Sequence, residues 1–369
     1  MSIGGIDIYD LTVVIPTYNE GKTVRCNILK LENFLFDSDI NAEILVIDDN
    51  STDNTVDEVK LVTNYRENVR MFLRDGERDL VRSVLFGIKN ANADIVVVID
   101  ADLAQDYTKI LDMYNHIKYD NYDIVAGSRF APGATINGCS FDRKVLSVCA
   151  NTIEHLIFPY ISDFGGFFAV RKDVCKDIPD YVRGQKALLE IVDKGSWKKS
   201  MNLPYNYTCN KMPSVVTFDR ITEYFLQLVS IVLGGILYRT NRAWEEIKNI
   251  TRFTIVGVFG IFVDLVLIFL LTDIFHIYYF VSGVIGTELS LLTNFVINDR
   301  WSFRGKMANG LKNRIVLFHK ISFGGIVIKL TVLYTLTTVF GVYYLLSSVI
   351  GLGFAYGWNM MMNRRYTWC

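Results

Sequence analysis

The chain has 369 residues, enough for two domains or more, and its formal net charge of −1 gives no overall field that would attract nucleic acid. Hydrophobic residues make up 51% of the sequence, a share that is high for a soluble protein and indicates membrane-spanning segments. The apolar runs concentrate after residue 224. Residues 1–10 have neither a basic start nor an apolar core, so we expect no signal peptide.

Six cysteines are scattered along the chain without the short spacings of a metal or disulfide motif. We therefore expect neither a disulfide framework nor a zinc site, and this usage fits a reducing compartment. The six are Cys26, Cys139, Cys149, Cys175, Cys209 and Cys369.

Short β-branched runs alternate with helical stretches through the first half of the chain. A helix is expected to follow the turn at 16–20 and to continue through Leu35. Strands that alternate with helices form a parallel, doubly wound sheet, in which ligands collect at the carboxyl ends of the strands. The predicted strands are 11–15, 43–47, 95–99 and 123–126.

Two carboxylates, Asp100 and Asp102, follow the strand at 95–99 directly. Side chains alternate along a strand, so a bend at Ala101 is needed to aim both carboxylates at one point. Paired oxygen ligands suit Mg²⁺ or Mn²⁺ better than zinc, and magnesium takes further ligands from phosphates and water. The motif therefore indicates a site for a metal-bound diphosphate. An acidic turn after a strand is the other interpretation.

Further polar clusters end the other predicted strands, at 16–20, 48–49 and 127–129. On one edge of one sheet, they favour a nucleotide-diphosphate site. The motifs PTYNE, DDNSTDNT, DADL, GSR, R-x-x-x-S and GFF, in this order, resemble family 2 glycosyltransferases of the GT-A fold. More narrowly, they are similar to the dolichyl-phosphate mannose synthase branch, the polyprenyl-phosphate glycosyltransferases, over about residues 10–215.

The resemblance implies a role for each matching residue. A divalent metal, Mg²⁺ or Mn²⁺, and the donor diphosphate would be held by Asp100, Asp102 and Gln105. The lipid phosphate would be gripped by Arg129, Arg143 and Ser147, since the planar fork of arginine binds phosphate oxygens bidentately. The residues implied for the nucleotide part of the donor are Pro16, Tyr18, Glu20, Asp48, Asp49 and Lys211.

Four departures from the family pattern bear on donor specificity and on activity. A glycine-rich turn is replaced by residues 79–81, and the glutamine expected after DADL is Ala104, with Gln105 one place late. The aspartate of the DxxSGFF element is Asp163 or is displaced. The RxxGxSK element is reduced to residues 210–211, with Tyr205 and Thr208 where arginine and glycine are expected.

The second half begins with a mostly apolar segment, 224–238, that is too short to span a bilayer. We expect an interfacial helix there, with a buried core helix as the alternative. Runs of about 20 apolar residues, the length that crosses a hydrocarbon core, predict four spans. These are 253–271, 278–297, 321–340 and 343–362.

Basic residues avoid the loops 272–277 and 341–342 and gather on the opposite side of the predicted spans. By the positive-inside rule, this asymmetry places the catalytic half and the C-terminus in the cytoplasm of a multi-pass membrane protein. The basic residues are Arg239, Arg242, Lys248, Arg252, Arg300, Arg304, Lys306, Lys312, Arg314, Lys320, Arg364 and Arg365.

The apolar half contains an internal repeat with an offset of 65 residues, in which 294–303 aligns with 359–368. The segment ELSLLTNFVINDRWSF is similar to the signature of GtrA-like membrane domains, a resemblance that covers about residues 250–369. The same offset pairs Asp264 with Lys329 inside two spans, and we predict that they form an ion pair. Glu288 is a third intramembrane charge, without an assigned partner. Snorkelling toward an interface is the alternative for all three.

These observations give one prediction. Residues 1–215 form a GT-A catalytic domain, an α/β, Rossmann-like fold with a doubly wound, mostly parallel sheet. Juxtamembrane interfacial helices follow at 216–250. Residues 251–369 form an all-α, GtrA-like transmembrane domain of four helices. The resemblance implies an enzyme that transfers a hexose, first of all mannose from GDP-mannose, to a polyprenyl or dolichyl phosphate with inversion. Membrane lipid is an expected partner, nucleic acid is not, and a homo-oligomer is left open.

Three alternatives remain from the sequence. One is a UDP-glucose-dependent polyprenyl-phosphate glucosyltransferase. The second is a membrane-bound nucleotide-sugar-binding protein without turnover, and the third is a sugar-lipid translocase or assembly partner.

Overall fold

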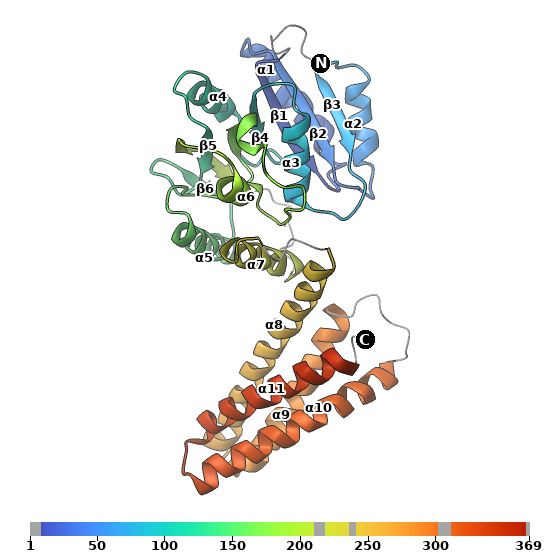
Figure 1. Cartoon of the computed structure of the whole chain (residues 1–369), viewed down its shortest axis with the longest axis vertical. Helices are drawn as coiled ribbons and strands as arrows, with labels where there is room; N and C mark the ends of the chain where they lie inside the picture. Colours follow the sequence, from blue (N-terminus) through green and yellow to red (C-terminus); the bar gives the residue numbers. More distant parts are fainter. Residues whose placement is uncertain (1–8, 210–217, 236–240, 302–310, 367–369) are drawn as a thin grey trace. The chain divides into compact units, whose positions relative to one another are not determined.

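The computed structural model describes residues 9–209, 218–235, 241–301 and 311–366. The chain forms two compact units, Met1–Ala243 and Trp244–Cys369. Figure 1 shows an α/β fold in the first and long helices in the second.

The first unit is built on a seven-stranded sheet with the order β3-β2-β1-β4-β7-β5-β8. β7 runs antiparallel to β4 and β5, and the other pairings are parallel. The predicted doubly wound, mostly parallel sheet is therefore confirmed. The strands are β1 Leu11–Thr17, β2 Ala42–Asp48, β3 Val69–Leu73, β4 Ile95–Val98, β5 Ile124–Ser128, β7 Phe168–Arg171 and β8 Ser200–Pro204.

A separate two-stranded parallel sheet pairs β6 Thr135–Asn137 with β9 Asn206–Thr208. Helices connect the strands of the main sheet and extend beyond them. They are α1 Val24–Asp37, α2 Thr55–Thr63, α3 Leu80–Asn90, the short η1 Tyr107–Lys109, α4 Ile110–Lys118, α5 Phe141–Ile157, the short η2 Lys172–Cys175, α6 Ala187–Lys194 and α7 Phe218–Val232.

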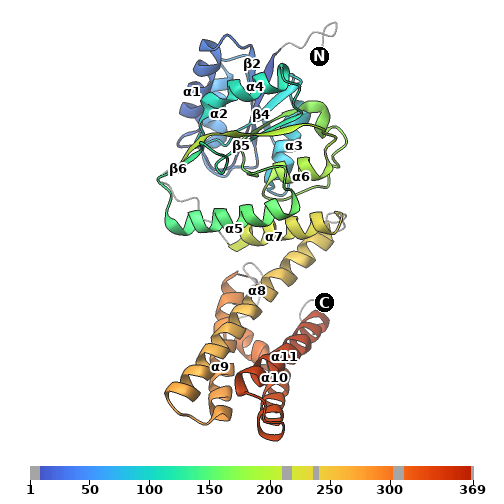
Figure 2. The same ribbon diagram turned by 90° about the vertical axis from the view of Figure 1, so that its left-hand side faces the viewer.

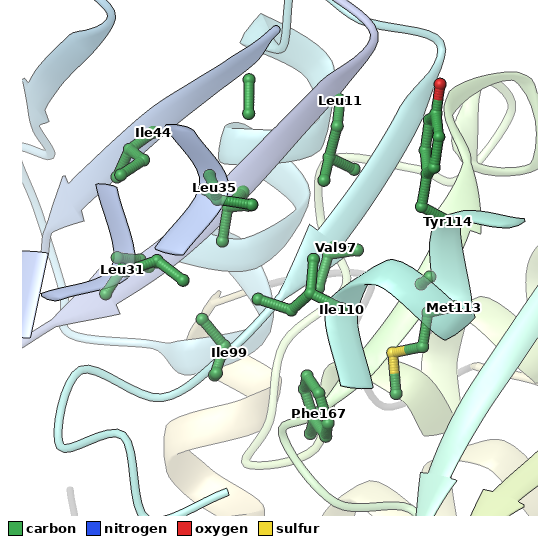
Figure 3. Close-up of a cluster of buried hydrophobic side chains, with 14 of the residues drawn as sticks. Leu11, Leu31, Leu35, Ile44, Val97, Ile99, Ile110, Met113, Tyr114 and Phe167 are labelled. Atoms are coloured by element: carbon green, nitrogen blue, oxygen red, sulfur yellow. The ribbon is translucent and has the colours of Figure 1, made fainter. Parts of the chain in front are cut away.

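The central strands are buried on both faces, which explains their continuous runs of β-branched residues. On one face, α1 contributes Val24, Ile28, Leu31 and Leu35, spaced at three to four residues as an amphipathic helix requires. α4 covers the same face, and Figure 3 shows its side chains packed among those of the strands. This core fixes the strand ends that carry the polar motifs.

The opposite face of the sheet is covered by α3, which approaches β1 closely at Gly87. A Cβ atom on Gly87 would lie 2.5 Å from Cγ1 of Val14, so only glycine fits there. α3 also packs against α6 on this face. The sheet is thus enclosed between two helical layers, as a doubly wound fold requires.

The predicted helix at 224–238 is displaced toward the N-terminus, since α7 spans Phe218–Val232. Gly234 and Gly235 adopt positive φ angles of 66° and 79°, a left-handed conformation that ends the helix. Part of the predicted range, 236–238, lies outside the described residues. One face of α7 is buried through Leu226 and Gln227, whereas Phe225 is 53% exposed on another face.

The second unit repeats its own secondary structure at the predicted offset. α8 Asn241–Phe269 ends in the π-helical turn η4 Leu270–Ile274, and α10 Leu311–Tyr334 ends in η5 Thr335–Val339. Adding 65 to the bounds of η4 gives η5, and adding 65 to α9 Tyr279–Trp301 gives α11 Tyr344–Tyr366. The internal repeat is therefore confirmed as two helical hairpins of one design.

Side-chain contacts obey the same symmetry. The hydroxyl of Tyr344 forms a hydrogen bond with Asp273, and the hydroxyl of Tyr279 forms one with Thr338. The two tyrosines are 65 residues apart, as are their two partners, so each hairpin contacts the π-helical turn of the other in the same way. Within the described residues, three helices are long and apolar enough to cross a membrane, at Thr254–Ile274, Tyr279–Ile297 and Ser322–Val339. The fourth predicted span lies on α11 and stays a prediction.

The predicted ion pair inside the spans is confirmed. Lys329 Nζ lies 2.7 Å from Asp264 Oδ1, and both side chains are buried. Thr287 and Ser348 also contact the pair, the latter donating to Asp264 Oδ2 at 3.3 Å. Glu288, the third predicted charge, lies on the exposed face of α9. The pair joins the two hairpins at their pseudosymmetric positions.

Removing one member of this pair is expected to destabilise the membrane unit. Lys329→Met leaves the Asp264 carboxylate buried without its counterion, which costs about 3 kcal/mol or more. Exchanging the charges as Asp264→Lys with Lys329→Asp is expected to restore at least half of the loss, because the two positions are equivalent in the repeat. Thermal unfolding in lipid nanodiscs measures both, with the exposed Lys320→Met on the same helix as the control. A charge exchange as unstable as the single variant would contradict this prediction.

Candidate active site

The loops after β1 and β2 are bonded to one another. Asn19 adopts a positive φ of 57°, and its backbone N–H donates to Ser51 Oγ at 2.9 Å. Asn19 Oδ1 accepts from the Thr52 N–H at 2.8 Å, and the Glu20 N–H donates to Thr55 Oγ1 at 2.8 Å. The segments that carry PTYNE and DDNSTDNT thus form one rigid edge, with Tyr18 and Glu20 half-buried on it.

Asp48 and Asp49 are both bonded within the protein. Asp48 is fully buried and accepts from the Ser51 N–H at 2.9 Å and from Thr17 Oγ1 at 3.2 Å. Asp49 accepts from the Asp79 N–H at 2.7 Å and from the guanidinium of Arg74. Burial raises the pKa of Asp49 and Arg74 opposes that rise. Both carboxylates therefore hold the loops after β1 and β2 in place in this structure.

The structure adds Arg78 to this edge, a residue that the sequence analysis did not single out. Its Cζ atom lies 3.7 Å from the ring centroid of Tyr18. Arg220 of α7 lies within electrostatic range of Arg78 and Glu20. Burial and the charge of Arg78 lower the pKa of Arg220, and Glu20 opposes this shift. Arg78 directly precedes residues 79–81, the segment that replaces the family's glycine-rich turn, and a single basic residue in a loop forms no recognisable motif.

At the end of β4, the chain turns at Ala101 and Asp102, and the Leu103 N–H donates to the Asp100 carbonyl at 3.1 Å. Asp102 Oδ1 accepts from the Ala104 N–H at 3.0 Å, and Gln105 Nε2 donates to Asp100 Oδ2 at 2.5 Å. The predicted bend at Ala101 is present. It brings the side chain of Gln105 against Asp100 although the glutamine is one place late in the motif.

This cluster carries an excess of negative charge. The pKa of Asp100 is raised by burial and then by Asp102, and the pKa of Glu20 is raised by burial and then by Asp102 and Asp100. A Cβ on Gly166 would approach Asp100 Oδ1 to 2.5 Å, so glycine is needed beside this carboxylate. Gln105 Oε1 is buried and has no hydrogen-bond partner within the described residues. These features fit a divalent cation held by Asp100, Asp102 and Gln105.

In the part of the chain that the structure describes, no group of three or more His, Cys, Asp and Glu side chains is arranged to hold a metal.

Arg129, at the end of β5, is held by Asp163. Its Nε and Nη2 each lie 2.8 Å from an Asp163 oxygen, and its backbone N–H donates to the same carboxylate at 2.9 Å. Burial alone would lower the pKa of Arg129, but the bonds from Asp163 outweigh it and the pKa is raised. The sequence left open whether the aspartate of the DxxSGFF element is Asp163 or is displaced. In the structure, Asp163 is the carboxylate that binds the arginine of the GSR motif. The bidentate bond fixes the guanidinium plane.

Arg143 and Ser147 lie one turn apart on α5 and are half-buried, so they share one face of that helix. Tyr207 of β9 connects them to the other predicted site residues. Arg129 Cζ lies 5.3 Å from the Tyr207 ring centroid. The pKa of Tyr207 is raised by burial, with Arg129 opposing, and it also responds to Asp102, Asp100 and Arg143. Tyr207 therefore contacts Arg129 and lies within electrostatic range of Asp100, Asp102 and Arg143.

The strand that carries Tyr207 is anchored from both sides. Tyr207 pairs with Gln105 through a β-bridge, and the Thr208 N–H donates to the Ala104 carbonyl at 3.1 Å. Cys209 forms a disulfide with Cys139, with Cα atoms 5.2 Å apart. The expectation of no disulfide is therefore wrong. The two cysteines are 70 residues apart in sequence and meet because β6 and β9 pair, which no local spacing reveals. Lys211 lies outside the described residues.

Comparisons with known proteins agree with these motifs. The profile of Glycosyl transferase family 2 matches residues 12–179, and that of the GtrA/DPMS transmembrane domain matches residues 252–368. A dolichol-phosphate mannosyltransferase of Pyrococcus furiosus is 31% identical over 364 residues, which cover 97% of this chain and 99% of the relative. The chain belongs to this family of glycosyltransferases.

The transferase therefore has a GT-A domain and a GtrA-like membrane domain. The Saccharomyces cerevisiae dolichol-phosphate mannosyltransferase is 28% identical over 194 residues, or 50% of this chain and 70% of that protein. Among solved structures, a mannosyltransferase from Pyrobaculum calidifontis matches with a TM-score of 0.43 and 13% identity, over 93% of this chain and 86% of its own.

The stability of the transferase is expected to fall as pH rises, in part through Asp79. This carboxylate caps α3 and accepts from the Gly184 N–H at 3.0 Å, and burial raises its pKa to about 7. The folded chain holds the proton more tightly than the unfolded chain. The contribution of Asp79 to the free energy of unfolding is thus complete below about pH 4, declines up to about pH 7 and is absent above, a difference of about 4 kcal/mol.

Asp79→Asn is expected to reduce the slope of unfolding free energy against pH between about pH 4 and 7, since the substituted group no longer titrates. Denaturant unfolding of the full chain, measured at several pH values, gives this slope. Asp75→Asn, an exposed change on the same loop, is the control. An unchanged slope for Asp79→Asn would show that the carboxyl is not protonated in the folded state.

Proposed function

We propose that the transferase moves mannose from GDP-mannose to a dolichyl or other polyprenyl phosphate at the cytoplasmic face of a membrane. The reaction depends on Mg²⁺ or Mn²⁺ and inverts the anomeric carbon. The choice of mannose is supported by the names of the curated relatives, which are dolichol-phosphate mannosyltransferases. The product is a lipid-phosphate-linked sugar.

The observation that carries the proposal is a continuous chain of contacts from the acidic cluster to the arginine. Asp100 accepts from Gln105, Gln105 pairs with Tyr207, and Tyr207 lies beneath the guanidinium of Arg129. Groups suited to a metal-bound diphosphate and groups suited to a second phosphate thus meet in one place. A transferase that joins a nucleotide-sugar to a phosphate acceptor requires both.

On the donor side, Asp100, Asp102 and Gln105 would hold the cation. Once bound, the cation neutralises charge on the departing nucleoside diphosphate. Tyr18 and Glu20 lie on the edge formed by the first two loops, where Asp48, Asp49 and Pro16 fix their positions. They would contact the nucleoside.

On the acceptor side, Arg129, Arg143 and Ser147 would hold the lipid phosphate in line with the anomeric carbon. A phosphate monoester has a second pKa near 6, so the acceptor is largely dianionic at neutral pH and needs positioning more than deprotonation. Asp163 occupies Nε and Nη2 of Arg129, which aligns Nη1 as a donor to phosphate. We assign no general base, and direct displacement gives inversion.

Apolar side chains exposed beside the acceptor residues support a lipid substrate. α5, which carries Arg143 and Ser147, also exposes Phe141 and Leu156, each 82% accessible. α7 lies alongside it, as Figure 2 shows, and Tyr224 of α7 bonds Glu154 of α5 at 2.7 Å. Two adjacent helices with exposed apolar faces suit the surface of a bilayer. The basic residues flanking the predicted spans favour the cytoplasmic side.

Transfer is expected to require Asp102. In membranes that contain the full chain, Asp102→Asn should reduce transfer of labelled mannose from GDP-mannose to dolichyl phosphate by 100-fold or more, on the order of 3 kcal/mol of lost electrostatic stabilisation. Chelation of divalent metal should abolish transfer, and added Mg²⁺ or Mn²⁺ should restore it. Asp57→Asn, an exposed change on α2, is the matched control.

The same assay separates the alternatives. Transfer from UDP-glucose in preference to GDP-mannose would identify a glucosyltransferase. Metal-dependent donor binding without transfer would indicate a binding protein, and passage of sugar-lipid across the bilayer without transfer would indicate a translocase. A product with retained anomeric configuration would contradict direct displacement.

Arg143 is expected to contribute to binding of the lipid phosphate acceptor and not to binding of the nucleotide-sugar donor. Arg143→Ala should raise the KM for dolichyl phosphate about 10-fold or more and leave the KM for the nucleotide-sugar within about 2-fold, as loss of a charge-assisted phosphate contact implies. Lys144→Ala removes an exposed neighbouring charge on α5 and should leave both values unchanged. Equal effects of the two substitutions would exclude a specific phosphate contact by Arg143.

A further inference from the structure

Tyr207 lies between the residues proposed for the metal and those proposed for the acceptor, and it belongs to neither set. Its backbone forms the β-bridge with Gln105, and the Cζ atom of Arg129 lies 5.3 Å from its ring centroid. Asp102 and Arg143, one from each set, lie within electrostatic range of its phenol. A side chain in this position would face both substrates of the proposed reaction.

The ring of Tyr207 is held by aromatic contacts that reach the hydrophobic core. It stands edge to face against Tyr205, with ring centroids 6.4 Å apart and an interplanar angle of 88°. Tyr205 is buried and contacts Phe167 of the core in the same way, at 5.3 Å and 80°. The pairing of β6 with β9 and the Cys139–Cys209 disulfide hold the backbone. The ring is therefore oriented before any ligand binds.

The hydroxyl of Tyr207 has no hydrogen-bond partner among the residues that the structure describes. The side chain is half-buried, but its oxygen is not one of the buried polar atoms that lack a partner, so it reaches solvent. Tyr224, another half-buried tyrosine of this unit, donates to Glu154 at 2.7 Å. Tyrosine hydroxyls in such surroundings usually find a partner. Tyr207 thus presents an oriented donor that the described protein groups leave unused.

This phenol suits an incoming phosphate. A tyrosine hydroxyl has an ordinary pKa near 10, so it carries its proton at neutral pH and is a neutral donor. A phosphate monoester presents three strongly accepting oxygens. When one of them attacks the sugar, the other two need donors that hold the group in line. Arg129 lies over the same ring, so a phosphate bound to its free Nη1 would approach this hydroxyl.

We propose that the Tyr207 hydroxyl donates a hydrogen bond to a non-reacting oxygen of the lipid phosphate, which makes Tyr207 a further catalytic residue. The inference rests on the proposed function. The acceptor is favoured over the donor because β9 pairs with β6, and β6 leads through the disulfide-bonded Cys139 into α5. That helix carries Arg143 and Ser147. The hydrogen bond would turn the third phosphate oxygen toward the anomeric carbon.

Transfer kinetics of the full chain in membranes test the hydroxyl. Tyr207→Phe keeps the ring against Arg129 and removes only the donor. It should lower kcat/KM for dolichyl phosphate about 10-fold or more and leave the KM for GDP-mannose within about 2-fold, as loss of a hydrogen bond to a charged group implies. Wild-type kinetics, or a change confined to the KM for GDP-mannose, would overturn the proposal. Tyr65→Phe, 83% exposed just after α2, is the matched control.

A second substitution separates the hydroxyl from the ring. Tyr207→Leu removes both, and thermal unfolding of each variant checks that it is folded. The proposal predicts that Tyr207→Phe already causes most of the loss seen in Tyr207→Leu. If the residue only supports Arg129, the ring suffices. Tyr207→Phe would then match the wild type and Tyr207→Leu alone would lose transfer, a result that contradicts the proposal.

Binding without donor or metal gives a readout that does not depend on turnover. In calorimetry of the full chain in lipid nanodiscs, Tyr207→Phe should weaken binding of geranyl phosphate and of inorganic phosphate, each about 10-fold, and leave binding of geraniol unchanged. Weaker binding of geraniol by the same factor would assign Tyr207 to the lipid chain and overturn the proposal.

The same titrations distinguish failure of the inference from failure of the proposed function. Equal affinity of the wild type for inorganic phosphate and geranyl phosphate would contradict a lipid acceptor, and with it the proposed function. Unchanged affinity of Tyr207→Phe for both phosphates would contradict the role of Tyr207 alone.

Discussion

The catalytic unit depends on repulsion between carboxylates that the fold forces together. β4 is buried on both faces, so the chain leaves the sheet at a fixed point, and the turn at Ala101 holds Asp100 and Asp102 close to each other. Burial and mutual repulsion raise the pKa of Asp100. A divalent cation held by Asp100 and Asp102, as proposed above, would relieve this unfavourable charge. Under that proposal, binding of the metal and of the donor would be coupled through this one constraint.

Attraction between opposite charges organises the residues proposed for the acceptor. Asp163 binds Arg129 with both oxygens, so the guanidinium is oriented without a ligand, and it lies over the ring of Tyr207. Both β-pairing with Gln105 and the Cys139–Cys209 disulfide keep this tyrosine in place. If the proposed site is correct, this preorganisation of opposite charges would lower the entropic cost of bringing two anionic substrates together.

The sequence predicted the parts of the fold that leave local patterns. Central strands such as β2 and β4 are continuous apolar runs, and the 65-residue repeat is visible by alignment, so the pairing of Asp264 with Lys329 followed from symmetry alone. Strands β3, β7 and β8 were not predicted, since they are short and partly polar. The Cys139–Cys209 disulfide and the stacking of Arg78 on Tyr18 depend on contacts between distant segments, which no spacing encodes. The place of the helix at 218–232 was missed because two glycines, not hydropathy, determine its end.

The most direct test of the central claim is electron paramagnetic resonance of Mn²⁺ bound to the full chain in the presence of GDP. The account predicts a single protein-bound Mn²⁺ with ³¹P hyperfine coupling from the diphosphate, lost in Asp100→Asn and in Asp102→Asn but kept in Asp57→Asn. Mn²⁺ that binds equally well without both aspartates, or that shows no coupling to phosphorus, would contradict it.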